Sequence, residues 1–298
     1  MNKNLGILAM FALFCFMSFS FVSCSDDNDS EKTGQVSAEQ TKHSEEEQKN
    51  ITYIGKKKPE EPKEVGDIVF SDGSATPYTD YLALTDEQIE KAISVIFYVG
   101  TECSNDDKSR MLGIGLVCSG SGLAWCTEDA NSKDAFATNN YSRGISTITC
   151  KPDDGSGNTK EMKFENALDK NGNDNLSQIG AFLKENDIND DTGIEEKYPA
   201  FYFAKNYMNA RGSRVKGSNF EDGWYFPSTA EVFQIMKTRY LCQAAVELCH
   251  GVFPKGNCNF WTASSNGVGQ GDVVTNTRTR FAMPFTETTN VVLAIREF

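Results

Sequence analysis

The distribution of apolar residues at the start of the chain predicts a leader rather than part of a folded domain. Residues 5–22 carry no charge and are mostly apolar, and they follow a short polar start that contains Lys3. A serine and then Cys24 come next, and the chain turns acidic over residues 25–30. A positive start, an apolar core and a small residue before the cut are typical of a signal peptide, here residues 1–23.

The cysteine directly after the cut makes this leader resemble a bacterial lipoprotein signal, although leucine is usual where Phe21 stands. The resemblance implies that Cys24 becomes the N-terminus and carries acyl chains such as palmitate, whose buried CH₂ groups hold the protein at a membrane with about 0.8 kcal/mol each. The acids that follow resemble the export signal of some bacterial surface lipoproteins, which implies the outer membrane and the cell surface. A plain secretory signal is one alternative. A retained membrane helix is the other, since residues 5–22 reach the lower limit of a span, but no Lys/Arg cluster follows them.

Residues 24–64 are predicted to form a flexible tether between this anchor and a folded domain. They contain the charge runs Glu45–Glu47 and Lys56–Lys58 and a single aromatic residue, Tyr53. Such a segment buries too little apolar surface to offset the entropy lost on ordering it. A solvated surface is the main interpretation of the lysine run, and contact with anionic lipid is the alternative.

From Val65 onward, apolar residues recur with the periods of strands and short helices. They predict strands over residues 65–70, 93–99 and 111–117. Thr85 and Gln88 have the spacing of a capping box, in which each side chain bonds to the other's backbone N–H, so a short helix is predicted from there to Lys91.

The last third of the chain is more strongly patterned. Pro199 suits the first turn of a helix whose apolar face continues to Met208, and Ser228 and Glu231 form a second capping box before another helix. Strands are predicted over residues 224–226, 259–265, 278–285 and 290–298, and polar loops over residues 151–197 and 264–277. Helices embedded among short antiparallel strands indicate an α+β fold.

Three stretches in this part resemble a family of bacterial surface domains. They are Asp222-Gly-Trp-Tyr-Phe-Pro-Ser-Thr-Ala-Glu231, Phe260-Trp-Thr-Ala-Ser-Ser265 and Val292-Leu-Ala-Ile-Arg-Glu-Phe298. The family is described by Gly-Trp-x-x-Pro-[Ser/Thr]-x-x-Glu, Trp-Ser/Thr-x-Ser-Ser and a closing Val-Arg-x-Phe strand, where this chain has Ile-Arg. It includes the C-terminal domain of a collagen-like bacterial adhesin and lipoproteins of spirochaetes and gut bacteria. The resemblance spans residues 65–298, is strongest over 199–298, and implies a C-type-lectin-like fold.

The residues that carry this resemblance favour a structural role over direct ligand contact, because they identify a fold rather than its cargo. They are Trp224, Pro227, Ser228, Glu231, Trp261 and Arg296. The first four are expected to set a corner between a strand and the next helix, and the second tryptophan is expected to pack near it. Arg296 is expected to pair with an acid such as Glu231.

Composition and charge exclude several classes of protein. Of the 298 residues, 39% are hydrophobic and 20 are phenylalanine, which is enough for a buried core. Asp and Glu number 42 against 29 Lys and Arg, and the resulting net charge of −13 argues against nucleic acid as a partner. With only two histidines, a histidine-rich metal site is excluded and a Ser-His-Asp hydrolase would have to use His250. We therefore expect no enzymatic activity.

The chain has nine cysteines. Cys15 is expected to leave with the leader, and Cys24 is expected to carry the lipid. The other seven are Cys103, Cys118, Cys126, Cys150, Cys242, Cys249 and Cys258. Cys118 and Cys126 flank a Ser/Gly stretch typical of a hairpin, so one disulfide is expected there and a second within the last three cysteines. Free buried thiols are the alternative. The wide spacing of the last three cysteines and His250 does not match a structural zinc site.

One acidic loop loosely resembles a calcium site. Asp187, Asn189 and Asp191 alternate as oxygen donors before Gly193, but an EF-hand needs its glycine one position earlier and a glutamate where Tyr198 stands. The sequence therefore predicts either weak calcium binding or a solvated acidic loop, and no other cofactor.

Together these features predict a lipid-anchored surface protein whose lectin-like domain binds an extracellular glycan or protein of the host or the envelope. Polar loops on a rigid scaffold commonly carry recognition. The negative charge disfavours sulfated polysaccharide unless arginines such as Arg278 and Arg280 form a local cluster. A structural envelope lipoprotein without a dedicated ligand is the main alternative, and a hydrolase with an acid–base pair in a cleft is the third.

Overall fold

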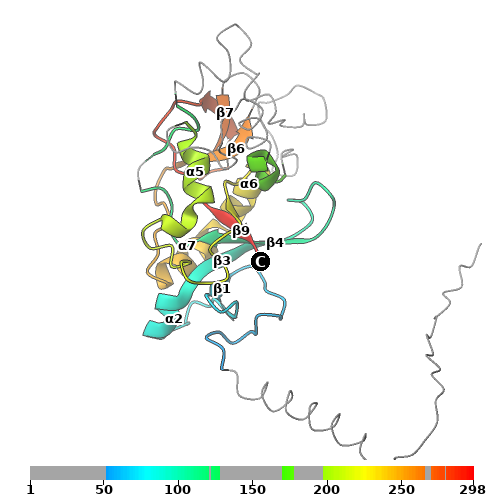
Figure 1. Ribbon diagram of the computed structural model, residues 1–298, viewed down its shortest axis with the longest axis vertical. Helices are drawn as coiled ribbons and strands as arrows, with labels where there is room; N and C mark the ends of the chain where they lie inside the picture. The colour runs from blue at the N-terminus through cyan, green and yellow to red at the C-terminus, as the bar shows by residue number, and fades with distance from the viewer. Residues whose placement is uncertain (1–51, 121, 128–169, 178–196, 266–269, 279) are drawn as a thin grey trace, which may run out of the picture. The chain divides into compact units, whose positions relative to one another are not determined.

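The computed structural model describes residues 52–120, 122–127, 170–177, 197–265, 270–278 and 280–298 (Figure 1). The predicted signal peptide, Cys24, Cys150 and the predicted calcium ligands Asp187, Asn189 and Asp191 lie outside these residues. In the described part of the chain, no helix has both the length and the apolar character needed to cross a membrane.

The larger of two sheets has six strands, all paired antiparallel, in the order β2-β1-β3-β4-β9-β5. The strands are β1 (Asp67–Phe70), β2 (Ala75–Pro77), β3 (Ala92–Gly100), β4 (Arg110–Gly115), β5 (Trp224–Tyr225) and β9 (Ile295–Glu297). They confirm the strands predicted before residue 230. The last predicted strand, over residues 290–298, is shorter in the structure, because only Ile295–Glu297 pairs with β4 and β5.

Strand β3 shows why the apolar run of residues 93–99 does not alternate. Its first seven residues, Ala92–Tyr98, are all buried. Helices α6 and α7 contact β3, so it has neighbours beyond the two strands beside it. A strand that is covered on both faces is expected to be continuously apolar rather than alternating.

The smaller sheet has three antiparallel strands in the order β6-β7-β8. They are β6 (Asn259–Ser265), β7 (Gln270–Thr275) and β8 (Arg280–Pro284). The polar loop predicted over residues 264–277 is therefore wrong, because much of it forms the central strand. Polar Asp272 is tolerated in this buried strand because its carboxylate pairs with the Arg280 guanidinium at 2.6 Å.

The helices are α2 (Asp86–Lys91), α5 (Pro199–Lys205), α6 (Thr229–Lys237) and α7 (Arg239–Leu248), with a 3₁₀ turn at Tyr207–Asn209. Both predicted capping boxes are confirmed, at Thr85/Gln88 for α2 and at Ser228/Glu231 for α6. Helix α6 contacts β3 of the larger sheet and both β6 and β7 of the smaller one, and Figure 1 shows it between them. Mixed helices and antiparallel sheets confirm the α+β class.

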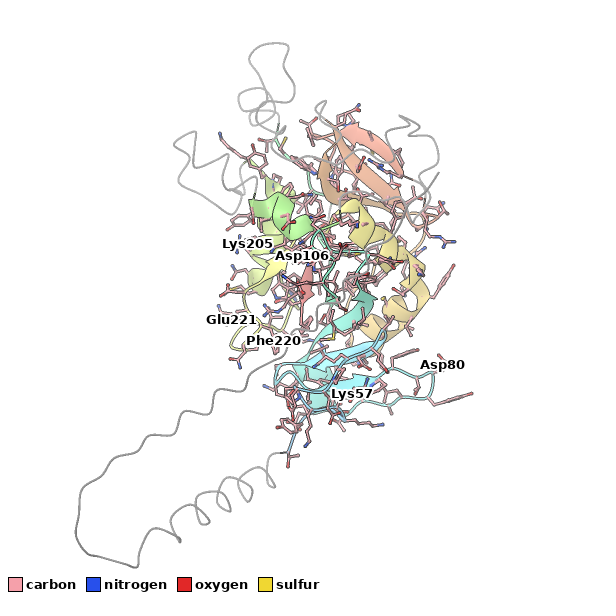
Figure 2. All side chains as sticks on the ribbon, turned by 90° about the vertical axis from the view of Figure 1, so that its right-hand side faces the viewer. Lys57, Asp80, Asp106, Lys205, Phe220 and Glu221 are labelled. Atoms are coloured by element: carbon pink, nitrogen blue, oxygen red, sulfur yellow. The ribbon has the colours of Figure 1, made fainter. Side chains whose placement is uncertain are left out.

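The folded unit begins earlier than the sequence suggests, at Thr52. Lys57 forms an antiparallel bridge with Ala75, and its ammonium group lies 2.7 Å from the buried carboxylate of Asp67 (Figure 2). Lys63 is also buried, and its ammonium group donates to a backbone carbonyl at 2.9 Å. The boundary expected between residues 64 and 65 therefore moves toward the N-terminus, because the backbone of Lys57 pairs with Ala75 and its side chain pairs with Asp67.

Candidate functional site

The corner between β5 and α6 contains four of the resemblance residues, Trp224, Pro227, Ser228 and Glu231. Ser228 caps α6, and the Ser228 N–H donates to the Glu231 carboxylate at 2.7 Å. Strand β6 packs against the same corner, because the Ala263 N–H donates to the Pro227 carbonyl at 2.7 Å and the Thr229 N–H donates to the Ser264 hydroxyl at 2.9 Å. Trp261 is fully buried in β6, where its indole N–H donates to the Leu123 carbonyl at 2.8 Å.

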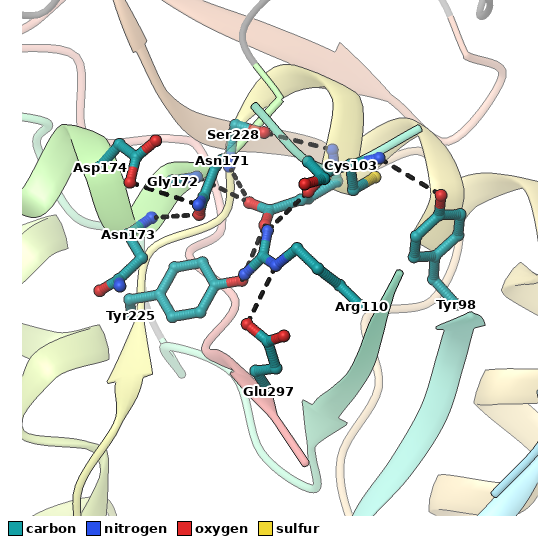
Figure 3. A network of polar contacts seen from close by, with 12 residues as sticks. Tyr98, Cys103, Arg110, Asn171, Gly172, Asn173, Asp174, Tyr225, Ser228 and Glu297 are labelled. Carbon is teal, nitrogen blue, oxygen red and sulfur yellow. Dashed lines mark hydrogen bonds and ion pairs between the residues drawn. The ribbon is translucent and has the colours of Figure 1, made fainter. Parts of the chain in front are cut away.

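Glu231 is the centre of a buried polar network at this corner, and Figure 3 shows its partners Arg110, Tyr225 and Ser228. Its carboxylate oxygen Oε1 lies 3.0 Å from a nitrogen of the Arg110 guanidinium and accepts from the Tyr225 hydroxyl at 2.7 Å. The expected Glu231–Arg296 pair is therefore wrong. Glu231 instead pairs with Arg110, which lies on strand β4.

The rest of the network satisfies Arg110 as well. Its guanidinium also donates to the Cys103 carbonyl at 2.7 Å, to the Tyr225 hydroxyl at 2.7 Å and to Glu297 at 3.0 Å. Burial raises the pKa of the Glu231 carboxyl, while Arg110 and the N–H donors around it act in the opposite direction. The polar groups of this network already form hydrogen bonds with one another. The network therefore holds the corner together and leaves Glu231 no free lone pair for an acid–base reaction.

The second oxygen of Glu231 holds a segment that is distant in sequence. Gly172 N–H donates to Oε2 at 3.0 Å, and a Cβ at this position would lie 2.0 Å from the Phe226 carbonyl, so only glycine fits. Asn175, on the helical turn that follows, donates to the Ala263 carbonyl at 3.2 Å. Residues 170–177 are thus fastened to the corner by its own polar groups.

A second buried network joins the start of α6 to the smaller sheet. The Thr229 hydroxyl lies 3.0 Å from the Asp272 carboxylate, which pairs with Arg280. Burial raises the pKa of Asp272, and Arg280 opposes that shift. Arg280 is therefore turned inward toward an acid. Arg280 therefore does not add its charge to the surface cluster that was considered for Arg278 and Arg280.

Arg296 occupies a different place from the one expected, between aromatic rings. The carbon of its guanidinium lies 5.2 Å from the ring centroid of Phe220 and 5.8 Å from that of Phe298. Nitrogens Nε and Nη1 are buried without a hydrogen-bond partner among the described residues. Faces of aromatic rings attract such donors, which accounts for their burial. Gly223, at φ +84°, leaves room for Nη1, since a Cβ there would lie 2.7 Å from it.

Among the described cysteines, Cys103, Cys118, Cys242, Cys249 and Cys258 are free thiols. Neither expected bond is present. The Ser119 N–H donates to the Val292 carbonyl and the Trp125 N–H donates to the Phe285 carbonyl, so the described residues around Cys118 and Cys126 bond to the segment between β8 and β9 rather than to each other.

The last three cysteines form no bond with one another either. Cys242 and Cys249 lie at opposite ends of α7, about 10 Å apart along its axis. Burial raises the pKa of Cys118 and of Cys242 to about 11 and that of Cys249 to about 12, so these thiols are neutral at physiological pH. No cluster of three His, Cys, Asp or Glu side chains suited to a metal ion occurs among the residues with described positions.

A cavity of about 480 Å³ has none of the six resemblance residues among its lining residues. Its walls come from the segment after β4, from the end of α7 with the loop that follows it, and from Val291 before β9. They comprise Cys118, Ser119, Gly120, Glu247, Gly251, Val252, Phe253, Pro254, Lys255 and Val291. Volumes of this order are typical of small-molecule sites.

Two contacts build the wall of the cavity. The Val252 N–H donates to the Leu116 carbonyl at 2.7 Å, which fastens the loop after α7 to the segment after β4. A Cβ on Gly251 would lie 2.5 Å from that same carbonyl, so this close approach needs glycine. No signal in the sequence marks this cavity, because its walls meet through tertiary contacts.

Two of the lining residues, Glu247 and Lys255, form an ion pair. The Lys255 ammonium group lies 3.0 Å from the Glu247 carboxylate, and their side chains are 69% and 37% exposed. The amide of Gln243 donates to the same carboxylate oxygen at 2.9 Å. The bond from Lys255 lowers the pKa of the Glu247 carboxyl, so the acid is ionised at neutral pH. The site thus offers one acceptor and one donor beside the apolar surface of Val252.

Comparisons with known proteins add little to this geometry. No protein-family model matches the chain, and no curated protein matches it. One solved structure, a fimbrial protein from Bacteroides ovatus ATCC 8483, is similar at 14% identity with a TM-score of 0.49. The match covers 79% of this chain and 49% of the fimbrial protein, so this chain corresponds to about half of that protein's length. At this level of similarity the match carries no argument about function.

Proposed function

We propose that this chain is a lipid-anchored protein of the bacterial cell surface whose folded domain binds an extracellular ligand, a glycan or a protein, at the cavity beside the end of α7. The anchor rests on the leader and Cys24. Ligand binding rests on the cavity of about 480 Å³ with an ion pair and an exposed valine among its lining residues. Concave sites that combine apolar walls with a few polar groups are the usual binding sites of proteins.

The proposal places recognition away from the residues that define the corner. Glu231 and Asp272 are buried and bonded to arginines, so they support the scaffold. Neither network contains a free acid–base pair in a cleft, which favours binding over catalysis. We also propose that the scaffold is C-type-lectin-like, on the strength of the corner motif and of two sheets joined through α6.

Binding of the detergent-solubilised full chain to a glycan array and to immobilised extracellular proteins tests this function. A Val252→Asp variant adds a charge at an exposed position of the cavity, where Val252 is 60% exposed, and is expected to abolish binding without affecting folding. Binding that survives this substitution would move the site elsewhere. Absence of any binding partner would instead favour a structural envelope protein.

A further inference from the structure

We propose that the cavity binds a neutral sugar, with the Glu247–Lys255 pair bonding to two adjacent ring hydroxyls. This inference rests on the proposed function, since it names the class of ligand for the same site. Its first support is charge. The carboxylate and the ammonium group among the lining residues already neutralise one another at 3.0 Å, so an ionic ligand finds no uncompensated counter-charge there.

The second support is the chemistry of the pair. A hydroxyl group both donates and accepts hydrogen bonds, whereas a carboxylate only accepts and an ammonium group only donates. Neighbouring hydroxyls on a ring can therefore donate to Glu247 and accept from Lys255 at the same time. Because Oε1 of Glu247 already accepts from Lys255 and from Gln243, the sugar hydroxyl would donate to the second carboxylate oxygen, Oε2.

The third support is the apolar surface that the cavity offers to the other side of the ligand. A sugar ring has aliphatic C–H faces as well as hydroxyls, and it needs apolar surface against those faces. Val252, Pro254 and Val291 supply that surface from two different segments. Gly120 adds access to it, since a Cβ at this position would have no atom within 4 Å. The cavity of about 480 Å³ is suited to one or two sugar residues.

An acidic sugar is disfavoured on the same grounds. Its carboxylate or sulfate would compete with Glu247 for Lys255, in a chain whose net charge is −13. Arginine does not compensate in this cavity, because no arginine is among its lining residues. The Glu247–Lys255 pair therefore binds hydroxyl groups in preference to anions.

The experiment uses the full chain in detergent micelles and an array of neutral, sialylated and sulfated oligosaccharides, followed by titration with methyl glycosides of glucose, galactose and mannose, with lactose and with maltose. Glu247→Gln and Lys255→Met are each expected to weaken binding of the neutral sugar about tenfold, the effect of one hydrogen bond to a charged group. The pair is exposed and contributes little to stability, so both variants are expected to fold normally.

Matched controls are Asp106→Asn and Lys108→Met, which remove an exposed ion pair of 2.6 Å in the turn between β3 and β4. They are expected to leave sugar binding unchanged. Preference for sialylated or sulfated glycans, or neutral binding unaffected by Glu247→Gln, would overturn the inference. If the array is negative and an extracellular protein binds in a manner abolished by Val252→Asp, the sugar inference fails and the proposed function stands. If neither glycan nor protein binds, both fail.

Discussion

Single side chains divide into those that hold the corner and those that remain available to a ligand. Glu231 belongs to the first group, since both of its carboxylate oxygens are bonded. Its local partner Ser228 was predictable, because a capping box has a fixed spacing of three residues. Its ion-pair partner Arg110 was not, because 121 residues separate them and the sequence contains other arginines. Glu247 belongs to the second group, and no motif marks it.

Breaking the buried ion pair from one side is expected to be costly. Arg110→Met leaves the Glu231 carboxylate buried without its cation, and we expect a loss of about 3–5 kcal/mol in the free energy of unfolding, measured by urea denaturation. Arg296→Met removes an arginine that makes no ion pair among the described residues and is expected to cost less. Equal losses for the two variants would contradict the assigned partner.

The pH dependence of sugar binding is expected to follow Glu247. Its pKa is lowered by Lys255 below the usual 4.5, so the carboxylate is charged in the folded protein at any pH above that value and is protonated only at lower pH. Binding is therefore expected to persist at pH 5 and to fall with a midpoint below 4.5. The Glu247→Gln variant should show a flat profile over this range. A midpoint above 4.5 would show that the carboxylate lacks its bond to Lys255.

Helices and strands were predictable where their signals are local. The two capping boxes and the apolar run of β3 confirm this, since each signal lies within one element. Strand β7 was missed because Gln270–Thr275 mixes polar and apolar residues, and its burial depends on pairing with β6 and β8 on either side. The same dependence on partners hides the cavity, whose walls come from three separate segments.

The two capping boxes provide a matched comparison of local and tertiary effects. Ser228→Ala is expected to cost about 1–2 kcal/mol of unfolding free energy, because it also leaves the buried Glu231 N–H without its side-chain acceptor. Thr85→Ala, at the exposed start of α2, is expected to cost about 0.5–1 kcal/mol. Thermal denaturation of both variants measures the difference. A larger loss for Thr85→Ala would show that the corner does not depend on its cap.

At the scale of the whole molecule, the proposed leader and Cys24 precede a folded unit that begins at Thr52. The net charge of −13 and the inward-turned Arg280 disfavour anionic partners. A surface location gives the cavity access to extracellular ligands, so the proposed function depends on the anchor at Cys24.

Mass spectrometry of the N-terminal peptide from protein purified out of its native membrane tests that anchor most directly. The predicted result is a chain that starts at Cys24 and carries acyl groups on this residue, and a Cys24→Ser variant is expected to lose them and leave the membrane fraction. An N-terminal peptide that retains residues 1–23, or a mature terminus without acyl groups, would contradict a lipid-anchored surface protein.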